Sequence, residues 1–343
     1  MRVALILIAL LCATQCALAA GARKIALPKD ESPLAAAWRA DGQALVLVSR
    51  KGGGLALRIA DPATGDVELV APPRGQGLAL SDKVYLSPIG TAVAVISPSA
   101  NQNAPAQLSI WATKGGAATQ VSLRDISPDF FPGTAAWKDD GSILFVAAAP
   151  YIKPEQPDSV IAVDAVRGGV QPAVIKGNLD LVDQLAYIPG RGMLAVKCRG
   201  IRGEYPSEPV VAIVTPSQPD MVVLHAEAQE FTLDPLADGT LLLEAPQSAR
   251  QRWILPPGQT TLRLFKPALP GTAWVASPDG KWLGTLADGR AVKRTAGQTF
   301  GVLQSTTGTR FVTSAPCAGL VFSPDSRKAL AFAPGQIVSI ELP

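Results

Sequence analysis

The sequence is poor in histidine and cysteine, which restricts the catalytic and metal-binding chemistry open to its 343 residues. The single histidine, His225, lies in MVVLHAEA, where we expect the end of an outer strand. A Ser-His-Asp site would have to use it, but no Gly-x-Ser-x-Gly elbow exists, so we interpret His225 as an ordinary strand residue. Of the four cysteines, two lie in the N-terminal leader described below. The remainder are too few for a zinc site, so we expect neither a metal nor a cofactor.

Signatures of calcium and phosphate binding are also missing. In KDDGS, Lys138–Ser142, the acids are adjacent and no glutamate follows in range, so we interpret them as hairpin-turn residues. KGGGLAL, Lys51–Leu57, is glycine-rich, but we expect it between two strands, with no helix N-terminus to receive a phosphate. Charge is nearly balanced, with 31 lysines and arginines against 28 acids. This balance argues against nucleic acid or an anionic membrane surface as a partner.

Long apolar runs are absent after the N-terminus. MRVALILIALLCATQCALAA combines Arg2, an apolar stretch over Val3–Cys12 and the small-x-small pattern of a signal-peptidase site at its end. The stretch is shorter than the roughly 20 residues that span a bilayer. We therefore expect a signal peptide over residues 1–19, cleavage near Ala19, no transmembrane segment, and export to the periplasm or medium of a bacterial cell.

Two cysteines remain after cleavage, Cys198 and Cys317. Export would permit a disulfide between them. The repeats described next place them in distant units, however, and the Cα atoms of a disulfide must lie within about 7 Å. We favour two separate buried thiols over a disulfide.

One pattern recurs along the mature chain: an apolar run, a tight-turn signal such as Asp-Gly, and a second apolar run. Such a turn tolerates positive φ and joins two antiparallel strands. Trp38, Trp137 and Trp274 are predicted to share one packing position in these units. The spacing of roughly 40 to 50 residues is typical of propeller blades. The seven copies are Ala36–Ser49, Val84–Ser97, Ala135–Ala148, Leu185–Cys198, Phe231–Glu244, Trp274–Gly289 and Leu320–Ala333.

A second hairpin follows in several units, as in Leu55–Val70 and Thr299–Ser314. Two hairpins give the four strands of one blade. The last unit supplies only three strands, and the mature start, Arg23–Pro28, can add the fourth and cover an exposed edge. The sequence therefore predicts an all-β fold: residues 20–343 form a single seven-bladed β-propeller, its last blade closed by the N-terminal strand.

The Ser-Pro-Asp-Gly turn, the apolar strand after it and the later Thr-Gly turn resemble the repeats of TolB-like propellers, which are WD-repeat-like. Similar repeats occur in the propeller domains of prolyl-oligopeptidase-type peptidases. The resemblance covers nearly the whole mature chain and implies the propeller fold. The N-terminal domain of TolB and the hydrolase domain of the peptidases have no counterpart in this sequence. It also has too few histidines for the metal centre of the TolB-like lyases.

Long loops are expected on one face of the propeller and tight turns on the other. Two of these loops combine tyrosine with charge, and loops on a rigid scaffold are frequent binding sites. Their candidate contact residues are Tyr151, Lys153, Glu155, Arg202, Glu204 and Tyr205. We interpret the chain as a monomeric, exported, non-catalytic scaffold that binds a protein or glycan partner in the cell envelope. The alternatives are an enzyme of lyase or glycosidase type, with a carboxylate-based site in the central channel, and a structural envelope protein without a ligand.

Overall fold

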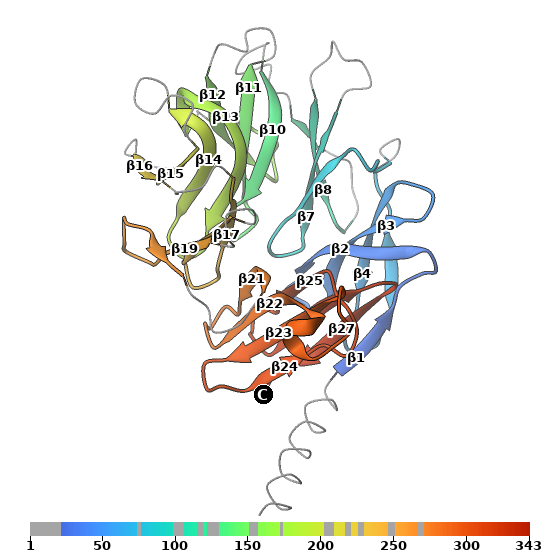
Figure 1. Ribbon diagram of the computed structural model, residues 1–343. Helices are drawn as coiled ribbons and strands as arrows, with labels where there is room; N and C mark the ends of the chain where they lie inside the picture. Colours follow the sequence, from blue (N-terminus) through green and yellow to red (C-terminus); the bar gives the residue numbers. More distant parts are fainter. Residues whose placement is uncertain are drawn as a thin grey trace, which may run out of the picture.

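The computed structural model describes residues 22–73, 77–98, 106–114, 119–121, 130–150, 157–171, 174–201, 209–216, 221–225, 230–245, 251–265 and 271–343. These residues form an all-β structure, and η2 (Gly289–Val292), a single 3-10 turn, is the helical segment among them. The sheets follow one another around a ring in chain order (Figure 1). This is the arrangement of a β-propeller.

Five sheets of the ring contain four antiparallel strands each. They are β2–β5 (Glu31–Trp38, Ala44–Arg50, Leu55–Ala60, Val67–Val70), β6–β9 (Lys83–Leu86, Ala92–Ser97, Gln107–Ala112, Thr119–Val121), β17–β20 (Thr232–Pro235, Leu241–Ala245, Gln251–Leu255, Arg263–Leu264), β21–β24 (Thr272–Ala276, Trp282–Asp288, Thr299–Ser305, Arg310–Val312), and β25–β27 (Gly319–Phe322, Lys328–Ala333, Gln336–Glu341) together with β1 (Ala22–Ala26).

The sixth sheet has seven strands. It contains β10–β16 (Phe130–Trp137, Ile143–Pro150, Asp158–Asp164, Ile175–Ile188, Met193–Ile201, Val210–Val214, Met221–His225). Its central strand, β13, is 14 residues long and pairs with β12 at Ile175 and Leu179 and with β14 from Leu179 to Ile188. The β13–β14 register shifts between Val182 and Gln184, directly after Leu181, which has φ of 47°. One long strand thus serves two successive groups of strands.

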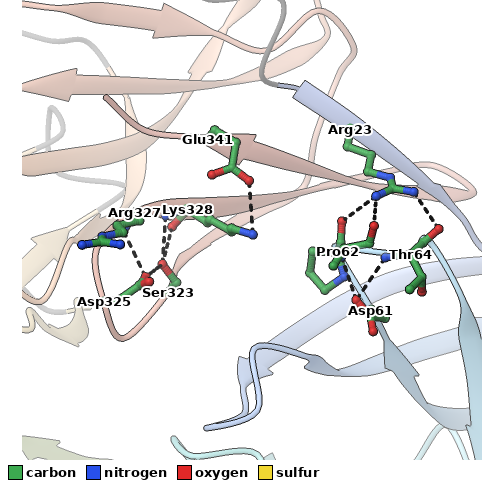
Figure 2. Close-up of polar contacts among 10 residues, drawn as sticks. Arg23, Asp61, Pro62, Thr64, Ser323, Asp325, Arg327, Lys328 and Glu341 are labelled. Carbon is green, nitrogen blue, oxygen red and sulfur yellow. Dashed lines mark hydrogen bonds and ion pairs between the residues drawn. The ribbon is translucent and has the colours of Figure 1, made fainter.

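Every one of the seven predicted repeats folds as an antiparallel hairpin. The turn between β25 and β26 explains why serine can replace the usual glycine. Ser326 adopts φ of 60°, and its hydroxyl accepts a hydrogen bond from the backbone N–H of Asp279 in the neighbouring β21–β22 turn, at 3.0 Å. In its own turn the Ser323 hydroxyl donates to Asp325 at 2.6 Å and accepts from the backbone N–H of Lys328 at 2.9 Å (Figure 2).

The predicted equivalence of the three tryptophans is wrong for Trp274. Trp38 and Trp137 end their strands next to the turn, whereas Ala276 has this place in β21. Trp274 lies two residues earlier, beside a bulge in β21, and packs under the guanidinium of Arg252 at 5.7 Å. Distance to the turn, and not residue type, sets the position in the ladder. All three side chains are buried, as expected for packing residues.

The N-terminal strand closes the ring as predicted. β1 pairs with β27 from Ala22 opposite Ile340 to Ala26 opposite Gln336, so the blue and red ends of the chain lie side by side (Figure 1). Ile25 of β1 is 1% exposed and belongs to the core cluster between the last and first sheets.

Arg23 extends the closure to the first sheet. Its guanidinium donates to the carbonyl oxygens of Pro62, Ala63 and Thr64 in the β4–β5 turn, at 2.7 Å for Thr64 (Figure 2). Five residues of β1 therefore connect the last sheet with the first by backbone pairing, apolar packing and side-chain hydrogen bonds.

The two cysteines are separate buried thiols, as predicted. Cys198 lies in β14, and Cys317 precedes β25, so they belong to different sheets of the ring. Burial raises the pKa of the Cys198 thiol to about 11 and also raises that of Cys317. Both therefore behave as apolar core residues at neutral pH.

A buried charge cluster lies between the β17–β20 and β21–β24 sheets. Arg252 Nη2 lies 2.9 Å from Glu244 Oε1 and also donates to the carbonyl oxygen of Gly271. Both partners of this ion pair are less than one-tenth exposed. Asp234 is the second acid: burial, and then the charge of Glu244, raise its pKa from an ordinary 3.8 to about 6, against a hydrogen bond with Thr232.

This pKa predicts how the stability of the chain changes with pH. Because folding raises the pKa of Asp234, its protonated carboxyl group contributes to the stability of the folded chain. This contribution is complete below about pH 4 and is lost as the pH rises through about 6. The free energy of unfolding of the parent, relative to Asp234→Asn, should fall by about 1–3 kcal/mol between roughly pH 4 and pH 7.5. Urea unfolding of both proteins at the two pH values measures this difference. A difference that stays constant with pH would show that Asp234 titrates normally.

Candidate functional site

An axial cavity of about 850 Å³ lies at the centre of the ring. The first strand of all seven hairpins contributes to its wall: β2, β6, β10, β13, β17, β21 and β25. A smaller hollow, of about 280 Å³, lies at the outer part of the β2–β5 sheet. The axial cavity has the size of a ligand-binding pocket, and it is the place where all the repeats meet.

The cavity reaches the face that carries the tight turns. Its lining continues from the strands into the hairpin turns, where Pro88, Pro189, Pro278 and Pro324 contribute to the wall. Alternate connections of an antiparallel sheet lie at opposite ends of its strands. The mouth is therefore at the ends of the sheets that carry the tight turns. The predicted binding residues follow β11 and β14, and both strands finish at the opposite ends of the sheets.

Most of the lining is apolar. It includes alanines of β2, β10, β13 and β21, together with the edges of buried aromatic side chains such as Trp38 and Phe322. Three polar lining residues form hydrogen bonds within the wall. The Tyr85 and Thr134 hydroxyls lie 3.3 Å apart, and Gln184 exchanges two hydrogen bonds with the backbone of Leu233, at 2.8 and 3.0 Å. These contacts join neighbouring sheets.

Asp139, in the β10–β11 turn, is the one charged side chain among the described residues of the wall. Its Oδ2 lies 3.5 Å from the backbone N–H of Gly190. The lysine before it, Lys138, is paired with Asp140 at 2.5 Å. Tyr187 also lines the cavity and stacks on Phe145, with ring centroids 5.8 Å apart. Burial, and then the charge of Asp139, raise the pKa of the Tyr187 phenol.

A carboxylate pair in the channel was the basis of the alternative enzymatic interpretation. Among the described wall residues Asp139 is a single carboxylate. Asp234 and Glu244 lie in β17 and β18, but neither belongs to the wall, and Glu244 is paired with Arg252. Across the described part of the chain, no group of three or more histidine, cysteine or acidic side chains is arranged around a common metal position.

The six loop residues predicted to contact a partner lie outside the described residues. Tyr151, Lys153 and Glu155 follow β11, and Arg202, Glu204 and Tyr205 follow β14. His225 is described: it is exposed at the end of β16, the outermost strand of its sheet, as predicted.

Sequence reasoning missed the cavity mouth because it judged the tight-turn face by the shortness of its loops. One signal was available. In five of the seven hairpins the residue two positions before the turn glycine, or before Ser326, lines the mouth; it is proline or alanine in four of them and an acid in one. Reading this position across the repeats would have identified Asp139.

No protein-family model matches the chain, and no curated protein sequence matches it either. Solved structures do. An oligogalacturonate lyase in complex with manganese superimposes with a TM-score of 0.60 at 14% identity, covering 94% of this chain and 90% of that one. The fold is a β-propeller.

Two further structures complete this comparison. A structure from an analysis of two prolyl endopeptidases matches the propeller with a TM-score of 0.59 at 13% identity, covering 96% of this chain and 53% of that one. TolB from Acinetobacter baumannii superimposes with a TM-score of 0.47 at 11% identity, covering 86% of this chain and 78% of that one. The structures with TM-scores of 0.60 and 0.59 confirm the expected propeller fold, and identities this low extend no further. No helix in the described ranges is long and apolar enough to cross a membrane.

Proposed function

We propose that this propeller is an exported, non-catalytic binding protein that receives an apolar segment of a protein partner in its axial cavity. The observation that carries the proposal is the composition of the wall, in which the strands of seven repeats present small and apolar side chains around about 850 Å³. Pockets that bury a ligand are lined mainly by such side chains, with a few polar groups that fix orientation. An apolar wall favours a peptide segment over a glycan.

We also propose that the ring has seven blades. Dividing the seven-stranded sheet within β13 gives two groups of four strands that share this strand, and five four-stranded sheets complete the number. Seven hairpins around one cavity support this count.

Export to the cell envelope is part of the proposal and rests on the leader-like residues 1–19. The six loop residues around Tyr151 and Tyr205 remain a proposed second contact on the opposite face. The cavity mouth and these loop residues would contact different parts of a partner, so substitutions in the cavity and in the loops can be tested separately.

The cavity proposal predicts that narrowing the mouth weakens binding. Ala276 is half-buried in the wall, and Ala276→Trp places a large side chain there. Ala112→Trp is the matched control, at an exposed alanine that ends β8 away from the cavity. We expect the partner purified with the parent and identified by mass spectrometry to bind Ala276→Trp at least about tenfold more weakly, because contacts at the centre of an interface contribute most.

Titration calorimetry of the purified partner against the three proteins measures this effect. Equal melting temperatures for both variants would show that the ring is intact. Equal affinity for Ala276→Trp and the parent would exclude the cavity as the binding site. Turnover of an envelope polysaccharide by the purified parent would contradict the non-catalytic proposal.

A further inference from the structure

The mouth of the axial cavity is built from one repeated position with one exception. In five hairpins the wall includes the residue two positions before the positive-φ residue of the turn. These residues are Pro88, Asp139, Ala237, Pro278 and Pro324. The turn therefore accepts an uncharged residue here, and a carboxylate at this place needs a separate explanation.

The turn itself does not supply that explanation. In each Asp-containing turn a different aspartate, the one directly before the positive-φ residue, accepts a hydrogen bond from the backbone N–H two residues further on, at 2.9 to 3.2 Å. In the β10–β11 turn Asp140 has this role. Asp140 also takes the neighbouring cation, Lys138, and the Ser142 hydroxyl.

Asp139 is thus left facing the cavity with little compensation. Its one hydrogen-bond partner among the described residues is the backbone N–H of Gly190, at the long distance of 3.5 Å. No lysine or arginine of the described residues forms an ion pair with it: the charge of Lys138 acts on Asp139, but the Lys138 ammonium is paired with Asp140. Tyr187 lies in the same wall, and its phenol pKa is raised first by burial and then by the charge of Asp139. A carboxylate at the edge of an apolar cavity attracts a cation more strongly than one in open water.

We propose that the ligand group entering the axial cavity carries a positive charge that pairs with Asp139, as a lysine or arginine side chain beside an apolar residue of the partner would. This inference rests on the proposed function and makes it more specific. The apolar wall holds the body of the group, while Asp139 at the mouth selects its charge and fixes its direction of entry. An ammonium or guanidinium also adds a charge-assisted hydrogen bond.

Three small probes with one aromatic body test this inference on the full-length mature protein. They are 2-phenylethylamine, which is cationic at neutral pH, 2-phenylethanol, which is neutral, and 3-phenylpropanoate, which is anionic. We expect the amine to bind about tenfold more tightly than the alcohol, and the anion most weakly. Asp139→Asn should bind amine and alcohol equally. Asp66→Asn, which removes an exposed acid from the β4–β5 turn, should retain the preference.

Ligand-detected NMR titration gives the dissociation constants, and melting temperatures show whether the variants fold. Asp139→Asn should melt with the parent, because the turn is held by Asp140. Equal binding of amine and alcohol to the parent, a preference that survives in Asp139→Asn, or no binding of any probe would each overturn the inference. If all three probes bind the parent equally and Ala276→Trp blocks them, the cavity still binds ligands and the charge inference alone fails.

Discussion

Removal of residues 22–26 should lower the melting temperature of the whole chain by about 10 °C or more, in a single transition. The deletion takes away the strand that pairs with β27, the Arg23 hydrogen bonds to the β4–β5 turn and the fully buried Ile25. Loss of a buried isoleucine side chain alone costs about 2–5 kcal/mol. The unpaired edge of β27 would in addition promote association between molecules.

Differential scanning calorimetry and sedimentation velocity measure both effects. Lys24→Ala is the matched control, because Lys24 is exposed and its backbone pairing with Val338 survives the substitution. A synthetic peptide of residues 20–30 should bind the deleted protein and restore part of its stability. A deletion variant that melts within about 2 °C of the parent would show that the two ends of the chain do not hold the ring closed.

Arg252→Ala should destabilise the chain by about 3–5 kcal/mol, because it leaves a buried carboxylate without its partner. Arg252 neutralises Glu244, donates to Gly271 and lies against the ring of Trp274, so one side chain connects two neighbouring sheets. Asp234 lies close to the same cluster, and the charge of Glu244 would act on it without compensation.

Urea unfolding at neutral pH compares this variant with two others. Lys281→Ala breaks an ion pair of 3.3 Å with Asp279, but the lysine is 73% exposed, so it should cost less than about 1 kcal/mol. The double variant Glu244→Leu with Arg252→Met should recover much of the lost stability, since it also removes the carboxylate that Arg252→Ala leaves without a partner. A cost for Arg252→Ala as small as that for Lys281→Ala would show that Glu244 is solvated in the folded chain.

The repeat units were predictable because each rests on local chemistry. A turn that needs positive φ and apolar strands on either side are both visible in a window of about 14 residues. Closure by β1 was predictable from the three strands of the last unit. These features do not depend on how neighbouring sheets pack, and the structure contains both the hairpins and the β1–β27 pairing as expected.

Other features depend on contacts between distant segments. β13 runs continuously through the boundary of two units because Ile175 and Leu179 pair with β12 while Leu179–Ile188 pair with β14. Glu244, Arg252 and Trp274 come together only when two sheets pack. Asp139 reads as an ordinary turn acid until the wall of the cavity shows which way it faces.

Site-specific photo-crosslinking in living cells tests most directly whether the axial cavity is the binding site. Benzoylphenylalanine is introduced in separate proteins at Ile89, an exposed large side chain at the cavity mouth, at Ala112 on the outer surface and at Tyr151 in the loop that follows β11. The account predicts one dominant adduct from position 89, joined to a partner segment that has a lysine or arginine beside an apolar residue, and no adduct from position 112. Adducts from position 151 without any from position 89 would contradict it, and so would a complete lack of adducts at position 89.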